Sequence, residues 1–158
     1  VTIAGGKWTT YRKMAEDVVN KALEMSGLEA RPCRPSQLRL HGGDSGKDGA
    51  GKWESYGTDG PFFNELLAKH PEWDQLIHPD LPIREVEVVW AVRYEMARTV
   101  EDVLSRRTRA LLLDANASIQ AAPTVARIMG LELDQDEGWI EEQIASFEKL
   151  AQNYCLNP

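Results

Sequence analysis

Residues 93–109 read Arg-Tyr-Glu-Met-Ala-Arg-Thr-Val-Glu-Asp-Val-Leu-Ser-Arg-Arg-Thr-Arg, and this stretch decides the fold of the longer part of the chain. Thr99 is followed three residues later by Asp102, which is typical of a capped helix start, because both side chains can satisfy N–H groups that the first turn leaves free. The helix continues through Val103 and Leu104. The stretch therefore predicts a helix that starts at Thr99.

Helical spacing also marks the sequence on both sides of this stretch. Apolar residues three and four apart place a series of side chains on one face. The helices expected from this spacing cover residues 61–70, 85–96 and 136–154. Asp114 caps a further helix, which Pro123 interrupts or restarts and which ends near Gly130. The fold class is mainly α, with a bundle-like helical domain in the second part of the chain.

The first residues follow a different pattern. Val1 to Ala4 alternate apolar and polar side chains and lead into Gly5 and Gly6, which predicts a short β-strand and a tight turn. A helix over about residues 10–26 comes next. Gly27 is its expected C-terminal cap, because glycine adopts the left-handed conformation at no steric cost.

Residues 28–60 carry little periodic signal. Pro32 and Pro35 break the backbone, and glycines crowd the stretch that follows. A short extended piece at residues 38–40 and a flexible loop are expected there, together with the domain boundary. We therefore divide the sequence into residues 1–29, a linker with a glycine-rich loop over 30–60, and a helical domain over 61–158.

Composition excludes several classes of protein. The chain has 158 residues, a formal charge of −7 and 42% hydrophobic residues, which fits one ordinary domain, with or without part of another. The acidic balance argues against a general nucleic-acid binder. No apolar stretch is long enough to cross a bilayer. Cys33 and Cys155 lie far apart, which is typical of reduced thiols in the cytosol, and no histidine lies at zinc-ligand spacing from them, so no metal site is expected.

The first candidate site is the turn at Gly5 and Gly6 together with the start of the helix that follows, which we call the glycine corner. Glycines let the backbone approach a ligand, and the helix N-terminus after them offers free N–H groups and a partial positive charge. First helical turns favour acids, yet Arg12 and Lys13 lie in or beside this one and Lys7 precedes it. Each cation opposes the helix dipole at a cost of about a few tenths of a kcal/mol. An anion in front of the helix would relieve the repulsion; the alternative is a surface turn whose cations point into solvent.

Two other patterns have plainer explanations. Residues 46–53 match the G-x-x-x-x-G-K spacing of a phosphate-binding loop, but Trp53 stands where Ser or Thr would bind Mg²⁺, and no hydrophobic strand precedes it. We interpret this match as chance. The acids and arginines of residues 93–109 could hold a neighbouring domain, although an internal ion-pair network that fixes the helices is the favoured interpretation.

Two segments, in this order and spacing, resemble a known family. Gly5-Gly6-Lys7-Trp8-Thr9-Thr10-Tyr11-Arg12 resembles the end of the FAD domain of the FAD-dependent glycerol-3-phosphate dehydrogenases. Residues 94–109 resemble the core of their C-terminal helical domain, and residues 112–115 also fit. The resemblance implies that residues 1–29 are the tail of a truncated Rossmann-type FAD domain. The strand at its start would then lack its sheet, and is expected to pair with another chain, to pack irregularly or to be mobile.

The resemblance also implies an activity for the parent enzyme. It would oxidise sn-glycerol 3-phosphate to dihydroxyacetone phosphate, with hydride passing to FAD and electrons to a quinone at the membrane or another acceptor. Lys7 matches a lysine near the substrate phosphate, and Arg12 would pair with substrate or with an acid of the missing domain. The segment beside the flavin, where N–H donors would stabilise negative charge, contributes Gly5, Gly6, Lys7, Thr9 and Thr10. No catalytic residue is expected in the chain itself.

The sequence lacks a dinucleotide fingerprint. Since no G-x-G-x-x-G follows a strand, we expect the chain alone neither to hold FAD tightly nor to turn over. The implied partners are the upstream FAD domain, glycerol 3-phosphate, and a quinone or membrane surface, with no nucleic acid. The sequence leaves open whether the protein forms a homodimer. The expected location is cytoplasmic, or peripheral on the inner face of the cell membrane. The rival class is a non-enzymatic helical interaction or regulatory module, which would have no use for the glycine corner.

Overall fold

The computed structural model describes residues 1–34, 38, 42–43 and 51–155. It divides into two compact units, Val1–Asp44 and Ser45–Pro158. The division falls inside the stretch 30–60 that the sequence analysis assigns to a linker.

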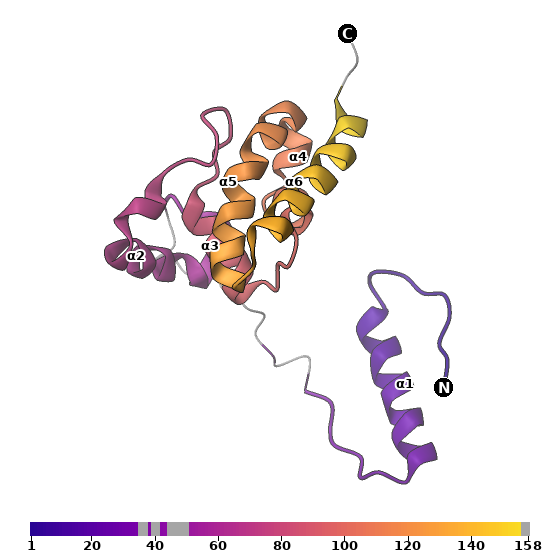
Figure 1. Ribbon diagram of the computed structural model, residues 1–158. Coiled ribbons are helices and arrows are strands. Elements are labelled where there is room, and N and C mark those ends of the chain that lie inside the picture. Colours follow the sequence, from indigo (N-terminus) through magenta and orange to yellow (C-terminus); the bar gives the residue numbers. More distant parts are fainter. Residues whose placement is uncertain (35–37, 39–41, 44–50, 156–158) are drawn as a thin grey trace. The chain divides into compact units, whose positions relative to one another are not determined.

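The first unit is organised around the helix α1 (Tyr11–Ser26). The residues before the helix run back along it as an extended segment (Figure 1), where Val1 and Ile3 border hollows against its apolar side chains. Gly27 ends the helix in the left-handed conformation, at φ 68°, as predicted. No residue of α1 is buried, so the described part of this unit has no core around the helix.

The strand predicted at Val1–Ala4 is not formed. Over the residues that the structure describes there is no strand, only an isolated bridge between Leu76 and Arg84. A strand needs a neighbour for its N–H and C=O groups. Within the described part of the first unit, residues 1–4 have no neighbouring strand to pair with, although their backbone is extended. The mainly α fold class is confirmed.

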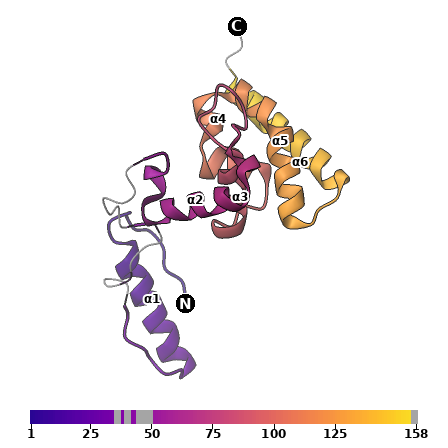
Figure 2. The ribbon, with the colours of Figure 1, turned by 90° about the vertical axis from the view of Figure 1, so that its left-hand side faces the viewer.

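The second unit consists of helices joined by short connections. In chain order these are η2 (Glu54–Asp59), α2 (Gly60–Lys69), η3 (Pro71–Asp74), α3 (Glu85–Tyr94), η4 (Asp102–Arg107), α4 (Ala110–Leu113), α5 (Ala115–Leu133), α6 (Glu137–Ala151) and η5 (Gln152–Tyr154). The two longest, α5 and α6, lie side by side in both views (Figures 1 and 2). α3 packs against α5 on one side and lies next to α2 on the other.

The helix α3 lies between two apolar clusters. Val88 and Val92 belong to the main core, which α3, η4, α5 and α6 share. Val86 and Trp90 belong to a second, aromatic cluster with Phe63 of α2. Trp53 completes this cluster and is buried, so the packed part of the second unit extends to the N-terminal side of residue 61.

The helix start predicted at Thr99 is confirmed. The Thr99 hydroxyl oxygen accepts from the Asp102 N–H at 3.1 Å, and Asp102 Oδ2 accepts from the Thr99 N–H at 3.0 Å. The helix then widens into the π-helix η4, because the Val103 carbonyl accepts from both the N–H and the hydroxyl of Thr108, five residues further on. Arg109 follows in the left-handed conformation, at φ 58°.

The helix α5 differs from the sequence prediction at two residues. It runs through Pro123 without a break, because buried neighbours such as Ala122 and Val125 pack it into the main core and offset the missing N–H. It also continues past Gly130 to Leu133. A Cβ on Gly130 would lie 2.9 Å from Ile140 Cδ1, so the glycine allows α6 to approach closely rather than ending α5.

Candidate functional site

The glycine corner has a backbone that other residues adopt with difficulty. Gly5 and Gly6 have φ values of 80° and 129°. A Cβ on Gly6 would lie 2.5 Å from Met14 Sδ, whereas one on Gly5 would meet nothing within 4 Å. Gly6 therefore serves both the turn and the approach of the corner to α1.

A turn closed by Thr10 connects the corner to the helix. The Thr10 N–H donates to the Lys7 carbonyl at 3.0 Å, and the Thr10 hydroxyl donates to the same carbonyl at 3.2 Å. Threonine at this position usually accepts a hydrogen bond from the first turn, but Thr10 makes no such cap. The first N–H groups of α1 therefore donate no capping hydrogen bond to the Thr10 side chain, and they point out of the N-terminal end of the helix.

The cations at this helix start are not all alike. Lys13 pairs with Glu16 at 3.3 Å and with Asp17 at 3.1 Å, and hydrogen bonds to Asp17 and Glu16 raise the pKa of Lys13. Lys7 and Arg12 have no acidic partner among the residues that the structure describes. The repulsion between cations and helix dipole is therefore offset at Lys13 and remains at the other two.

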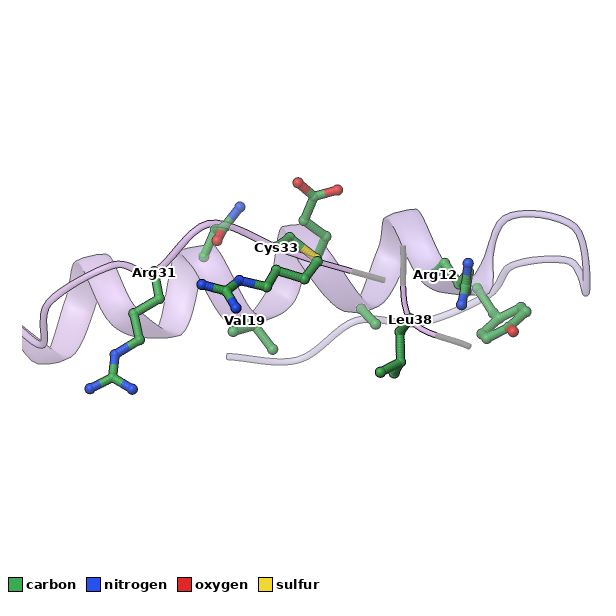
Figure 3. Close-up of a pocket in the computed structure, with 10 residues that line it drawn as sticks. Arg12, Val19, Arg31, Cys33 and Leu38 are labelled. Atoms are coloured by element: carbon green, nitrogen blue, oxygen red, sulfur yellow. The ribbon is translucent and has the colours of Figure 1, made fainter. Parts of the chain in front are cut away.

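The structure brings some of the predicted site residues together and separates others. Gly5, Gly6 and Lys7 line one hollow of about 520 Å³ beside the start of α1. Arg12 instead lines a different groove of about 430 Å³ (Figure 3). Thr9 and Thr10 are exposed and are not among the lining residues of either.

The arginines of residues 93–109 mostly contact groups within their own unit. Arg106 pairs with Glu101 at 2.5 Å and with Asp102 at 2.9 Å. Arg93 forms two hydrogen bonds with Glu132, at 2.6 and 2.7 Å, and so connects α3 to α5. These contacts form the internal ion-pair network favoured from the sequence, and Glu132, which lies outside residues 93–109, also belongs to it.

A polar hollow in the second unit was missed by sequence reasoning. Its volume is about 300 Å³, and Tyr56, Glu87 and Arg107 are among its lining residues. Glu87 accepts from the Tyr56 hydroxyl at 2.9 Å, and burial raises the pKa of its carboxyl group. The pair is 31 residues apart in sequence, and no spacing rule connects residues so distant.

The phosphate-loop-like match falls mainly outside the described residues. Of residues 46–53, the structure describes 51–53. Trp53 is buried in the aromatic cluster, and its indole N–H donates to Asn64 Oδ1 at 3.2 Å. The tryptophan that departs from the phosphate-loop pattern is thus a core residue here.

The described residues offer neither a metal-binding cluster nor a membrane-spanning helix. They contain no group of three or more His, Cys, Asp or Glu side chains placed to hold a metal ion. Among them, no helix is both long and apolar enough to cross a membrane.

Comparison with known proteins identifies relatives over nearly the whole chain. A family model described as the C-terminal domain of alpha-glycerophosphate oxidase matches residues 51–140. The mitochondrial glycerol-3-phosphate dehydrogenases of Bos taurus and Homo sapiens are each 33% identical over 94% of this chain. That of Saccharomyces cerevisiae is 31% identical over 94% of it. No solved structure matches the chain.

These relatives are longer than the chain and overturn one expectation. The chain spans 23% of the bovine and human proteins and 29% of the yeast protein. The cytoplasmic location expected from the sequence is wrong, because each of these relatives is mitochondrial by name. With a helical unit that matches the family model over residues 51–140, and relatives that are 33% identical over 94% of it, this chain belongs to the glycerol-3-phosphate oxidase and dehydrogenase family.

Proposed function

We propose that the chain is the C-terminal part of an FAD-dependent glycerol-3-phosphate dehydrogenase. The parent oxidises sn-glycerol 3-phosphate to dihydroxyacetone phosphate and passes electrons through FAD to a quinone or another acceptor. The family membership supports the reaction class, and the names of the relatives support a mitochondrial parent. In this proposal the helical unit is joined to an FAD-binding oxidoreductase domain of the parent, and these 158 residues carry no dinucleotide fingerprint for that domain.

The observation that carries the proposal is the start of α1. Thr10 leaves the first N–H groups without its hydroxyl as acceptor, the first turn contains no acid, and Lys7 has no described acidic partner. Such a start attracts negative charge. These residues fit the pyrimidine edge of a flavin, which gains negative charge when it is reduced, because preorganised donors stabilise charge that develops there.

The glycines, the N–H groups after Thr10 and Lys7 have different tasks in this proposal. Bound FAD supplies the hydride acceptor. Gly5 and Gly6 let the backbone come close to the ring, and the N–H groups after Thr10 orient its polar edge. Lys7 holds the substrate phosphate as a point charge. We propose no substrate contact for Arg12, because it lines the other groove.

The chain alone should bind no flavin tightly and turn nothing over. The hollow beside Lys7 is open to solvent, and the sequence contains no fingerprint for the adenosine half of FAD. A visible flavin spectrum in the purified chain would contradict this expectation.

Substitution of Lys7 in the intact parent tests the function. Lys7→Ala should raise the KM for glycerol 3-phosphate about ten- to hundredfold, because a hydrogen bond between charged groups contributes about 1.5–3 kcal/mol. Lys13→Ala is the matched control: it removes a cation of the same first turn that already pairs with Glu16 and Asp17, and should leave KM unchanged. Unchanged kinetics in Lys7→Ala, with flavin still bound, would remove Lys7 from the site.

A further inference from the structure

The polar hollow of the second unit is bordered by three separate elements. Tyr56 comes from η2, Glu87 from the first turn of α3, and Arg107 from the end of η4. The volume of the hollow, about 300 Å³, is at the lower end of the range for small-molecule sites and suits a ligand of a few heavy atoms. All of its lining residues belong to the helical unit, so the hollow is separate from the glycine corner.

Glu87 keeps unused acceptor capacity in this hollow. Its Oε1 accepts from the Tyr56 hydroxyl at 2.9 Å, and its Oε2 accepts from the Arg84 N–H at 2.7 Å. Each carboxylate oxygen has two lone pairs, so each can accept one more hydrogen bond. Burial raises the pKa of Glu87 despite the two donors, which means that the protein compensates its charge only in part. A cationic donor in the hollow would complete that compensation.

The other cations that act on Glu87 are paired outside the hollow. The charges of Arg84 and Lys52 favour the ionised form of Glu87, although burial outweighs them. Both side chains pair with Asp74, and neither lines the hollow. Neither can therefore move in beside Glu87 without giving up its contact with Asp74.

The π-helix η4 places Arg107 at the hollow. The Arg107 Nε–H donates to the Glu95 carbonyl at 2.9 Å, and its guanidinium has no acidic partner among the described residues. The widened turn also holds the Thr108 hydroxyl to the Val103 carbonyl at 2.8 Å, and such turns are rare and frequent at functional sites. With Nε fixed, the two amino groups of the guanidinium can make a bidentate contact with an anion.

We propose that the polar hollow binds a small zwitterion, with its ammonium group at Glu87 and its carboxylate at Arg107. Unlike charges at two places in one small hollow match a molecule that carries both. A simple anion would meet the carboxylates of Glu87 and Glu95, and a simple cation would meet Arg107. Ile83, which is 4% exposed, supplies an apolar wall for a short side chain. The ligand class is therefore a free α-amino acid with a short aliphatic side chain.

L-Alanine is the probe, because it carries both charges and a single methyl group. Titration into the ¹⁵N-labelled chain should shift the NMR signal of the Arg107 Nε–H in a saturable way. The Arg93 Nε–H, which Glu132 holds away from the hollow, should not shift. Propionate lacks the ammonium group and ethylamine lacks the carboxylate. Each should bind about ten- to a hundredfold more weakly, because a hydrogen bond between charged groups is lost.

Three variants locate the binding, which saturation transfer from the protein to the alanine methyl group measures. Arg107→Met removes the guanidinium and should weaken binding about tenfold or more. Ser55→Tyr fills the hollow from an exposed lining position, keeps all of its charges, and should abolish binding even if Arg107→Met unfolds. Arg127→Met is the matched control, because Arg127 is another exposed arginine whose Nε–H donates to a backbone carbonyl, that of Pro123 at 3.2 Å, and it does not line the hollow. It should bind L-alanine as the wild type does.

The proposal is overturned if propionate or ethylamine binds as tightly as L-alanine, if Ser55→Tyr leaves binding unchanged, or if Arg107 and Arg93 shift together without saturation. The intact parent should give the same saturation transfer as this chain; its loss there would show that another part of the parent covers the hollow. Because the measurement follows binding and not turnover, it is independent of the effect of Lys7→Ala on KM, and either proposal can fail alone.

Discussion

The Tyr56 hydroxyl lies 2.9 Å from Glu87 Oε1 and donates a hydrogen bond to it, which fastens η2 to the first turn of α3. The other carboxylate oxygen, Oε2, accepts from the Arg84 N–H at 2.7 Å. Burial raises the pKa of Glu87, and the hydrogen bonds from Arg84 and Tyr56 oppose that shift. Burial, together with the charge of Glu87, also raises the pKa of Tyr56, so the phenol stays protonated and donates.

Removal of this phenol should destabilise the helical unit. Tyr56→Phe leaves one oxygen of a partly buried carboxylate without its donor, and should lower the free energy of unfolding at pH 7 by about 1–3 kcal/mol. Urea unfolding followed by circular dichroism measures the loss. Tyr154→Phe, at an exposed tyrosine, is the control and should change little.

The same variant should change the pH dependence of stability. The folded pKa of Glu87 lies above its unfolded value, so its contribution is favourable at low pH and is lost as pH rises through the folded pKa. Tyr56→Phe should raise that pKa further. The stability difference between the variant and the wild type should therefore shrink when Glu87 is protonated; a difference that stays constant from pH 4 to pH 7 would refute this.

The capping box at the start of the 99–107 helix should show the opposite pH dependence. Burial favours protonation of Asp102, but hydrogen bonds from Arg98 and Thr99 and the charge of Arg106 outweigh it and lower its pKa. Its contribution is present above the unfolded pKa and lost as pH falls through the folded one. Asp102→Asn should cost about 1 kcal/mol at neutral pH, and less in acid. Glu141→Gln, an exposed acid of α6, is the control in the same urea titrations.

Local signals in the sequence were sufficient to predict the helix starts. The caps at Thr99, Asp114 and Asp136 each join a side chain to a backbone N–H three residues away, as at Asp114 Oδ1 and the Ala117 N–H at 2.9 Å. Such contacts depend on sequence neighbours alone. The glycine at the end of α1 is predictable for the same reason.

Features that depend on distant residues could not be predicted. Pro123 stays helical because of buried neighbours, and Gly130 is needed because Ile140 of another helix approaches it. Tyr94 falls at helical spacing from the buried Trp90, yet it is 55% exposed, and the centroids of the two rings lie 4.3 Å apart. At the corner, the glycines and cations were evident in the sequence, but only the fold separates the groove of Arg12 from the hollow of Lys7.

The ion pair between Arg93 and Glu132 should be weakly but measurably coupled. It joins α3 to α5 through two short hydrogen bonds, and Arg93 also lies over the Trp73 ring. Because the arginine side chain is 37% exposed, solvent screens the pair. A double-mutant cycle with Arg93→Ala and Glu132→Ala should give a coupling free energy of about 1 kcal/mol. A coupling near zero would mean that the two helices are held together by the main core alone.

The close approach of α6 to Gly130 should make this position intolerant of a methyl group. Gly130→Ala places a Cβ 2.9 Å from Ile140 Cδ1 and should cost about 1–3 kcal/mol, despite the better helix propensity of alanine. Adding Ile140→Val, which removes that Cδ1, should recover part of the loss. Gly138→Ala, whose Cβ would meet only Asp136 Oδ1 at 3.4 Å, should instead be neutral or stabilising.

Gly6 should be the most sensitive position of the corner in the intact parent. Its φ of 129° strains any other residue, by about 1–3 kcal/mol, and its Cβ would collide with Met14 Sδ. Gly5→Ala meets the strain without the collision. Gly6→Ala should therefore lower kcat/KM for glycerol 3-phosphate more than Gly5→Ala does, because it also displaces the corner from α1. Met14→Ala, added to Gly6→Ala, removes the collision and should restore part of the activity. Equal effects of both glycine substitutions, with no recovery from Met14→Ala, would show that the approach of Gly6 to α1 does not position Lys7.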